Sequence, residues 1–458
     1  MRRRSIEGAV RVPLLVALLA LAASARAGAD AALGTPVGAR LVTLEEAYGL
    51  AQRDNPTLEQ MQARVRGATA EVGRAWSQLK PTVNLSGSYT LNDPVVSFDL
   101  GAFAPAGSPA SDPIVIQRRH QLGLALQAGV PLFRGPAYQQ LGVARKGVAA
   151  AELRVVRRRQ DYLLRVAEAY YAGLGASEVA TALEEKVGVD QQNLAVVRAR
   201  LEVGRVLRSD VVRAELVLVQ DEQALRRQRN ALLAAQRRLA ILIGLNEPIA
   251  LRRPPEPAAV PADESAMLRT ALNRRADVAA LRLDIAAAEQ ARKAVTWSFF
   301  PTLDLSLLYR WQNVAGFADR RDTLAIVATL GLPLYEGGLR YANRRSAEAR
   351  IAEGQAARAE LARGIAETVV QLRADLLSAE AGLISADKAA ALAAVIVDEM
   401  ASRYEAGTAT QLDLLDATQR RLEARIDLTR SRDARDLARI ALAHELGQRQ
   451  PFEREARR

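Results

Sequence analysis

Two kinds of hydrophobic pattern follow each other along the chain. After Pro81, and again after Pro301, apolar and polar residues alternate with a period of two, which predicts strands with one apolar face. A second alternating strand follows in each case, so the pattern predicts two β-hairpins, at residues 82–130 and 302–332. Each strand has about 10 residues, the length that crosses a membrane when tilted. The Pro-, Gly- and Ser-rich stretch 93–113 is expected to be loop.

Helical periodicity occupies most of the remaining chain. Residues 135–203 and 338–405 place apolar residues at spacings of three, four and seven, which predicts two very long helices. At about 1.5 Å per residue, each would extend on the order of 100 Å. The pair Asn55-Pro56 is expected to interrupt the first of the shorter helical stretches. These shorter stretches are predicted at residues 44–79, 210–244, 263–297 and 411–447.

Both long helices end in the same short pattern. An apolar run reaches a glycine and restarts as a helix with an aspartate six positions later, at Gly204 and Asp210 and again at Gly407 and Asp413. Glycine supplies the left-handed conformation that ends a helix, and Thr410 with Asp413 three residues later is typical of a helix N-cap. The sequence therefore predicts two helical-hairpin tips, at residues 201–213 and 404–416.

The hairpins, long helices and tips occur twice, with the tips about 200 positions apart. SQLKPTVNLSGSY resembles SFFPTLDLSLLY, and VPLF resembles LPLY. Matched prolines mark the predicted helix–strand junctions, where they fix the backbone as the period changes: Pro81, Pro131, Pro301 and Pro333. We therefore expect a mainly α fold with a small β part and an internal repeat. Its segments would be a first repeat at 28–246, a linker at 247–262, a second repeat at 263–447 and a tail at 448–458.

Composition narrows the possible functions. The 458 residues include no cysteine and two histidines, so disulfides, thiolate nucleophiles and common zinc clusters are excluded or disfavoured, and no metal site or cofactor is expected. The net charge of +11 suggests nucleic acid, but the arginines alternate with glutamates and aromatic residues make up only 4% of the chain. We expect neither nucleic-acid binding nor enzymatic chemistry, because no acid, base, nucleophile or metal set is clustered.

The N-terminus has the pattern of an export signal. Three arginines at residues 2–4 precede an apolar run at 12–23, and small residues at Ala25 and Ala27 suit a signal peptidase. We expect residues 1–27 to be removed by cleavage near Gly28. The apolar run is shorter than the roughly 20 residues that a membrane-spanning helix needs.

Export and the four strands together predict an oligomer in a membrane. An open sheet edge is not tolerated in lipid, and the smallest membrane barrels have about 8 strands. The chain must therefore pool its strands with other copies of itself. An alternative of another class is a structural periplasmic coiled-coil protein, which would have no strand pairs.

The order of these motifs resembles that of the TolC-like outer-membrane efflux proteins. The likeness runs through LVTLEEAYGLAQRDNPTLE, KPTVNLSGSY, VPLF, LPLYEGGLR and YEAGTATQLDLLDAT. It implies a homotrimer that shares one β-barrel in the outer membrane of a Gram-negative cell, with a helical tunnel in the periplasm. The implied partners are a periplasmic adaptor, an inner-membrane transporter and outer-membrane lipid. The implied function is passive conduction in small-molecule efflux, with type I protein secretion or metal efflux as alternatives.

The resemblance also implies a gate at the tips. Asp413 and Asp416 match two acidic residues that form rings at the constriction. A preference of acids for the helix N-terminus explains Asp413 well and Asp416 less well, so we favour the lining role. Tyr404 and Asp210 match two of three residues that hold the tip closed. The third position, an arginine in the family, is Ala409 here.

Either the closed state is looser in this chain, or Arg205 or Arg208 of the first tip supplies the missing cation, and we hypothesise the second. The two tips would also contact the adaptor, through Gly204, Arg205 and Arg208 in the first and through Gly407 and Thr408 in the second.

Overall fold

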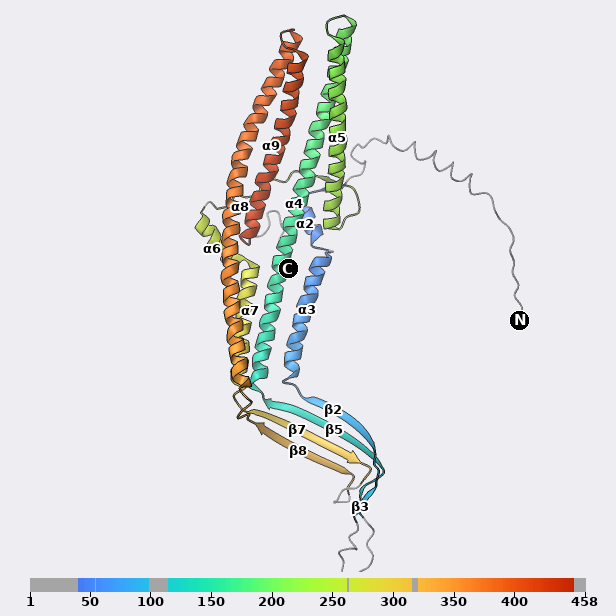
Figure 1. The fold of residues 1–458 in the computed structure, drawn as a ribbon, viewed down its shortest axis with the longest axis vertical. Helices are drawn as coiled ribbons and strands as arrows, with labels where there is room; N and C mark the ends of the chain where they lie inside the picture. Colours follow the sequence, from blue (N-terminus) through green and yellow to red (C-terminus); the bar gives the residue numbers. More distant parts are fainter. Residues whose placement is uncertain (1–39, 54, 99–113, 262, 315–319, 449–458) are drawn as a thin grey trace, which may run out of the picture. The chain divides into compact units, whose positions relative to one another are not determined.

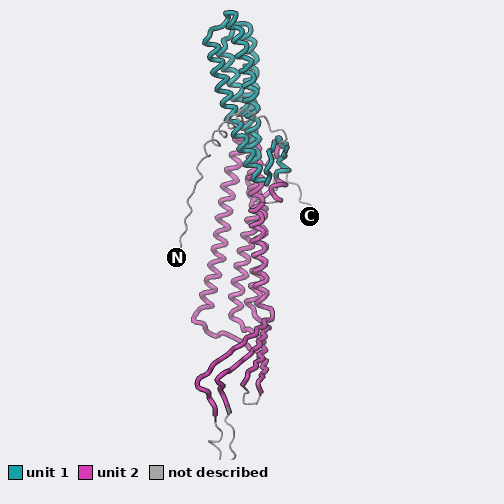
Figure 2. Tube along the Cα trace, turned by 90° about the vertical axis from the view of Figure 1, so that its right-hand side faces the viewer, with its two compact units in different colours: residues 1–47, 168–255, 384–433 teal, residues 48–167, 256–383, 434–458 magenta. Residues whose placement is uncertain are grey.

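The computed structural model describes residues 40–53, 55–98, 114–261, 263–314 and 320–448 (Figure 1). The predicted signal peptide and residues 449–458 of the predicted tail lie outside this range. The chain divides into two compact units (Figure 2). Unit 1 contains the described residues up to 47 together with 168–255 and 384–433, and unit 2 contains the others. Each unit therefore draws segments from both predicted repeats.

Helices make up most of the chain, as the sequence predicts. The two longest, α4 and α8, have 68 and 67 residues. None of the described helices combines the length and the apolar character needed to cross a membrane. The helices are α2 (Leu44–Ala51), α3 (Pro56–Ser77), α4 (Gly135–Glu202), α5 (Arg208–Ile243), α6 (Glu264–Arg274), α7 (Ala276–Trp297), α8 (Leu339–Glu405) and α9 (Gln411–Glu445).

The predicted helix over residues 263–297 is wrong in one respect, because it is broken between α6 and α7. Arg275 has an extended backbone (φ −65°, ψ 129°) and its side chain donates to Asp277 at 2.7 and 3.1 Å. The turn after α9 packs against this break: a Cβ at Gly447, which has φ +66°, would lie 2.9 Å from the backbone of Arg274 and Arg275. A tertiary contact thus breaks a stretch that is helical by local pattern.

The predicted interruption at Asn55-Pro56 is present. Asn55 separates α2 from α3, and its side chain accepts from the Thr57 and Leu58 amides at 2.9 and 3.4 Å. It is therefore the N-cap of α3, with Pro56 at the first helical position, where its missing N–H costs nothing.

Unit 2 contains a four-stranded antiparallel sheet in the order β2-β5-β7-β8 (Figure 1). Its strands are β2 (Thr82–Leu91), β5 (His120–Phe133), β7 (Thr302–Gln312) and β8 (Asp322–Gly331). Both predicted hairpins are confirmed, and the pairing of β5 with β7 joins the two halves of the chain. These strand pairs argue against the coiled-coil alternative.

The register collects the apolar side chains on one face of the sheet. One row across the four strands consists of Leu85, Leu126, Tyr309 and Leu324, and the neighbouring row on the other face consists of Ser86, Ala125, Arg310 and Thr323. Because side chains alternate between faces, this register repeats along the strands. The apolar face is exposed: Leu85 keeps 70% and Leu324 62% of its accessible surface.

The junction prolines occupy unequal positions. Pro81 and Pro301 directly precede β2 and β7. Pro131 lies within β5, where the pairing with β7 shifts register, and Pro333 lies two residues beyond β8. At this junction Arg134, just after β5, forms a 2.8 Å ion pair with Asp304 of β7.

Two short strand pairings were not predicted or contradict the prediction. β3 (Val96–Phe98) pairs with β4 (Ile114–Gln117), so the loop expected at 93–113 is wrong at β3. In unit 1, β1 (Arg40–Val42) pairs in parallel with β6 (Ile249–Leu251), inside the predicted linker. The buried Tyr170 hydroxyl donates to the Arg252 carbonyl at 2.6 Å and lies 2.9 Å from that of Val42.

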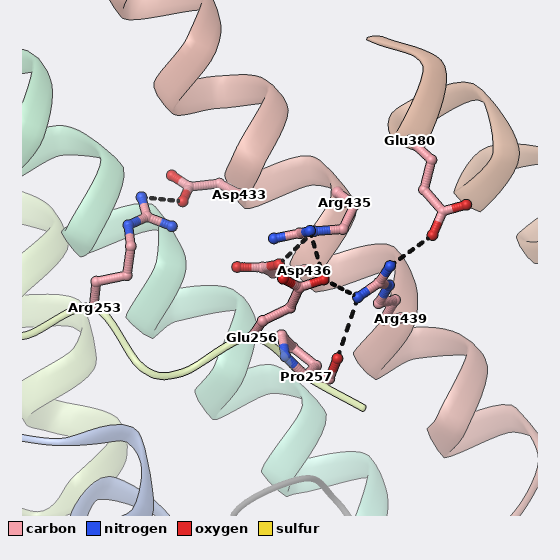
Figure 3. A network of polar contacts seen from close by, with 8 residues as sticks. All are labelled: Arg253, Glu256, Pro257, Glu380, Asp433, Arg435, Asp436 and Arg439. Carbon is pink, nitrogen blue, oxygen red and sulfur yellow. Dashed lines mark hydrogen bonds and ion pairs between the residues drawn. The ribbon is translucent and has the colours of Figure 1, made fainter. Parts of the chain in front are cut away.

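Ion pairs of arginine residues connect the segment after β6 to the helices (Figure 3). In unit 1, Arg253 donates to Asp433 of α9 at 2.7 Å and to Glu178 of α4 at 2.9 Å. In unit 2, Arg435 of α9 donates to Glu256 at 2.7 Å. Arg439 also contacts Glu256, and it donates to Glu380 of α8 at 2.8 Å.

The α4–α5 coil of unit 1 contains a buried charged group. Lys186 of α4 donates to both oxygens of Asp190 at 2.6 and 2.7 Å and to Asp221 of α5 at 2.8 Å. One cation thus serves two carboxylates. Burial, together with the Asp221 carboxyl, raises the pKa of Asp190 to about 6, although Lys186 opposes the shift. Packed beside this group are apolar side chains of α4, α5 and α9, among them Leu183, Val187, Leu225 and Leu422.

Removing the charge of Asp190 should stabilise the coil at neutral pH. Asp190→Asn leaves one lysine with one carboxylate, and we expect it to raise the free energy of unfolding near pH 7.5 by about 1 kcal/mol. The folded-state pKa of Asp190 lies above its unfolded value, so the wild type gains stability as the pH falls and loses it as the pH rises through about 6. The advantage of the variant should therefore shrink toward pH 5.

Urea unfolding of the detergent-solubilised protein across this pH range measures the effect. Lys186→Met is the opposing control, because it leaves two unpaired buried acids and should destabilise the protein by about 3 kcal/mol. A loss of stability in Asp190→Asn near pH 7.5 would contradict the interpretation.

Candidate functional site at the helix-hairpin tips

The first tip lies between α4 and α5 in unit 1. Gly204 adopts φ +72°, and the Arg205 amide donates to the Arg200 carbonyl at 2.8 Å, which closes the end of α4. The Asp210 carboxylate accepts from the Leu207 amide at 3.1 Å and so caps α5.

This tip also exposes apolar and cationic side chains. Val203 keeps 67% and Leu207 70% of its surface. Arg205 and Arg208 are exposed too, and neither has an ion pair with another described residue. Such a surface is suited to a partner rather than to the packing of its own coil.

The second tip lies between α8 and α9, also in unit 1. Gly407 adopts φ +76°, and the Thr408 amide donates to the Arg403 carbonyl at 2.9 Å. The predicted N-cap is confirmed: the Asp413 carboxylate accepts from the Thr410 hydroxyl at 2.7 Å and from its amide at 2.8 Å. The Asp413 amide in turn donates to the Thr410 hydroxyl at 3.2 Å. Thr410 lowers the pKa of Asp413 through these bonds, so the carboxylate is ionised and held in place.

Asp416 shares a helix face with Asp413, as the spacing of three predicts. It forms a 2.9 Å ion pair with Arg420, one turn further along α9. Both side chains are exposed, Asp416 by 57% and Arg420 by 70%. Arg420 is not among the residues predicted from the sequence, although an aspartate and an arginine four positions apart on a helix are a recognisable signal.

Tyr404 is buried at the end of α8 and contacts the first hairpin. The Arg200 guanidinium lies over its ring, 4.5 Å from the centroid. The Tyr404 hydroxyl has no hydrogen-bond partner among the described residues, and Asp210 is engaged at its own helix end. The cation at Tyr404 in this chain is thus Arg200, which is not among the residues predicted from the sequence. A compensating role of Arg205 or Arg208 stays a prediction.

A groove lies in unit 1 between α4, α8 and α9. It has a volume of about 110 Å³. Arg425 of α9 forms a bidentate ion pair with Glu185 of α4 across it, at 3.0 Å for one of the two contacts. Its lining combines apolar and charged side chains: Ala182, Glu185, Lys186, Val189, Val397, Thr418, Arg421, Leu422 and Arg425.

Within the described ranges, no three His, Cys, Asp or Glu side chains converge to hold a metal ion. The tip residues instead provide charge, exposed apolar surface and contacts between hairpins.

Known proteins share this organisation. The sequence model of the family described as "Outer membrane efflux protein" matches residues 47–245 and 267–448, one segment in each predicted repeat. Protein CyaE of Bordetella pertussis is 28% identical over 427 residues, covering 89% of this chain and 85% of CyaE. Outer membrane protein TolC of Vibrio cholerae is 25% identical, covering 91% of this chain and 94% of TolC.

Solved structures agree in fold. CusC, whose structures concern transmembrane channel formation, superposes with a TM-score of 0.74 at 18% identity, over 88% of this chain and 92% of CusC. The open state of the MtrE outer membrane channel of Neisseria gonorrhoeae gives a TM-score of 0.71 at 19% identity, over 90% of each chain. The predicted fold class, the outer-membrane location and the non-enzymatic nature of the protein are confirmed by the family. Since the family model matches well over half of its length, this chain belongs to the outer membrane efflux protein family.

Proposed function

We propose that the protein is the homotrimeric outer-membrane exit channel of a tripartite export system. Substrates would reach it from an inner-membrane transporter through a periplasmic adaptor and would leave the cell passively. The observation that carries this proposal is the sheet β2-β5-β7-β8, with its continuous exposed apolar face. An apolar face of this size, on strands of 10 to 14 residues, fits the hydrocarbon of a bilayer.

The edges of this sheet support assembly with other copies. β2 and β8 are its outermost strands, and lipid cannot satisfy the backbone groups of an open edge. Closure requires β8 of one copy to pair with β2 of the next. Three copies, the number that the resemblance implies, would bring the barrel to about twelve strands, above the minimum of about eight.

The tips are proposed as the gate and the adaptor surface. Asp413 and Asp416 would form the acidic constriction, with Tyr404 and Asp210 in the contacts that hold it closed. The exposed residues of both tips would receive the adaptor, among them Gly204, Arg205, Arg208, Gly407 and Thr408. The exposure of Val203 and Leu207 supports this second role.

We propose small molecules as the cargo, because the family is one of efflux proteins. Deleting the gene and measuring susceptibility to a panel of toxic small molecules tests this choice. Increased susceptibility, restored by the wild-type gene, supports it. Unchanged susceptibility together with loss of a secreted protein from the medium would point to type I secretion, and selective metal sensitivity would point to metal efflux.

The acidic constriction predicts cation selectivity in planar bilayers. Asp416→Asn should lower the cation-to-anion permeability ratio about two- to fivefold, equivalent to about 0.5–1 kcal/mol for an ion passing charges a few ångströms away. The reversal potential in a KCl gradient measures this ratio. Asp427→Asn is the matched control, because it removes the same charge from the same helix three turns from the tip and should have a smaller effect. Equal effects of the two variants would place the constriction elsewhere.

The contact between Arg200 and Tyr404 predicts a second effect on the gate. A cation–π contact contributes about 0.5–1 kcal/mol at an exposed site and about 2 kcal/mol when it is desolvated. Tyr404 is buried, and three copies would add their contributions. Arg200→Gln and Tyr404→Leu should therefore raise the resting single-channel conductance or the open probability several-fold.

Two further variants separate the alternatives in that measurement. Tyr404→Phe keeps the ring and removes only the unpaired hydroxyl, so it should behave as the wild type. The double variant Arg205→Ala, Arg208→Ala tests whether these residues supply the missing cation; an unchanged conductance would refute that hypothesis. Wild-type conductance in Arg200→Gln would refute the role of Arg200.

A further inference from the structure

One face of α9 carries a row of charged residues that begins at the second tip. Its members follow one another at spacings of three and four: Asp413, Asp416, Arg420, Glu423 and Asp427. At about 100° per residue, all five lie within an arc of about 80°. All five are exposed in the chain. We call this row the α9 ladder.

The ladder has one positive member, and it is placed beside the proposed constriction. Arg420 Nε lies 2.9 Å from a carboxylate oxygen of Asp416. An exposed pair four positions apart on a helix contributes only about 0.3–0.5 kcal/mol to stability. The pair therefore contributes little to the stability of α9. Its larger effect is on the net charge of this part of the helix.

The two acids of the constriction are held differently. One carboxylate oxygen of Asp413 accepts from Thr410 at the helix end, and no cation of the described residues pairs with it. Asp416 faces a guanidinium. The charge of this turn of α9 is thus −1 per chain when Arg420 is counted and −2 when it is not.

We propose that Arg420 is a selectivity-determining residue of the channel, which offsets the Asp416 carboxylate and leaves the constriction only weakly selective for cations. The proposal rests on the proposed function, which puts Asp413 and Asp416 at the constriction. The two charges of the pair lie 2.9 Å apart, far less than the Debye length of about 8 Å at physiological salt, so an ion in the throat responds to their sum. The throat then admits anionic as well as cationic cargo.

Arg421 provides a matched control for this role. It is the next residue along α9, carries the same charge, and lies about 100° away around the helix. It lines the groove with Glu185 and Arg425 and is not part of the ladder. Arg420→Gln and Arg421→Gln therefore remove the same charge at nearly the same height.

The test measures reversal potentials of the reconstituted full-length channel in a KCl gradient. We expect Arg420→Gln to raise the potassium-to-chloride permeability ratio at least about twofold and to lower the MgCl₂ concentration that half-blocks the conductance. Arg421→Gln and Arg420→Lys should stay near the wild type. The double variant Arg420→Gln, Asp416→Asn restores the net charge of the turn and should return the ratio toward the wild-type value.

The outcomes separate this inference from the function on which it rests. Equal ratios for Arg420→Gln and Arg421→Gln, with Asp416→Asn still altered, overturn the role of Arg420 and leave the constriction in place. An unchanged ratio in all of these variants overturns both. A raised ratio that Asp416→Asn does not reverse also counts against the proposal, because the effect would then not come from charge compensation. Arg420→Glu provides a further readout, with an expected ratio above that of Arg420→Gln.

Discussion

Backbone hydrogen bonding in lipid is the constraint on which the rest of this structure depends. A strand whose amides and carbonyls face hydrocarbon must find a partner strand on each side. The chain supplies four strands in the order β2-β5-β7-β8 and therefore ends with two edges. Its apolar face, formed by rows such as Leu85, Leu126, Tyr309 and Leu324, is stable only against lipid. The same sheet thus requires both a membrane and further copies of the chain.

The change from strand to helix is governed by local chemistry at few positions. Proline sets the backbone before β2 and β7, and glycine with positive φ ends α4 and α8. Between these positions, the local sequence does little to end the long helices. Their stability comes from packing against neighbouring helices, because an isolated helix gains too little from propensity alone.

The elements that the sequence predicts are those with a strong local signal. Period-two alternation located β2, β5, β7 and β8, and the glycine and Thr410–Asp413 patterns located both tips. The family resemblance, carried by these same motifs, led to the correct fold class. The break at Arg275 was missed because it depends on the packing of Gly447, about 170 positions away. The pairing of β1 with β6 was missed because three-residue strands have no measurable period.

Side-chain pairing at the tips was predictable only where both partners lie on one helix. Asp413 with Thr410 was found from spacing, and Asp416 with Arg420 could have been. The contact of Arg200 with Tyr404 joins α4 to α8, and the contact of Lys186 with Asp221 joins α4 to α5. Contacts of this kind require the relative rotation of two helices. A few degrees of rotation change which side chains meet, while the hydrophobic pattern stays the same.

The membrane-facing and tip-facing parts of the chain therefore vary under different constraints. In the sheet, each residue of the apolar face contributes the same kind of apolar surface. Substitutions among Leu, Ile and Val should therefore keep the fold and leave function unchanged. At the tips, an exposed charge contributes little to folding, and Arg205, Arg208 and Arg420 can be exchanged at small cost in stability. Under the proposed function, such positions could change selectivity and partner without changing the architecture. Ala409, at the position where the resemblance implies an arginine, is compatible with this freedom.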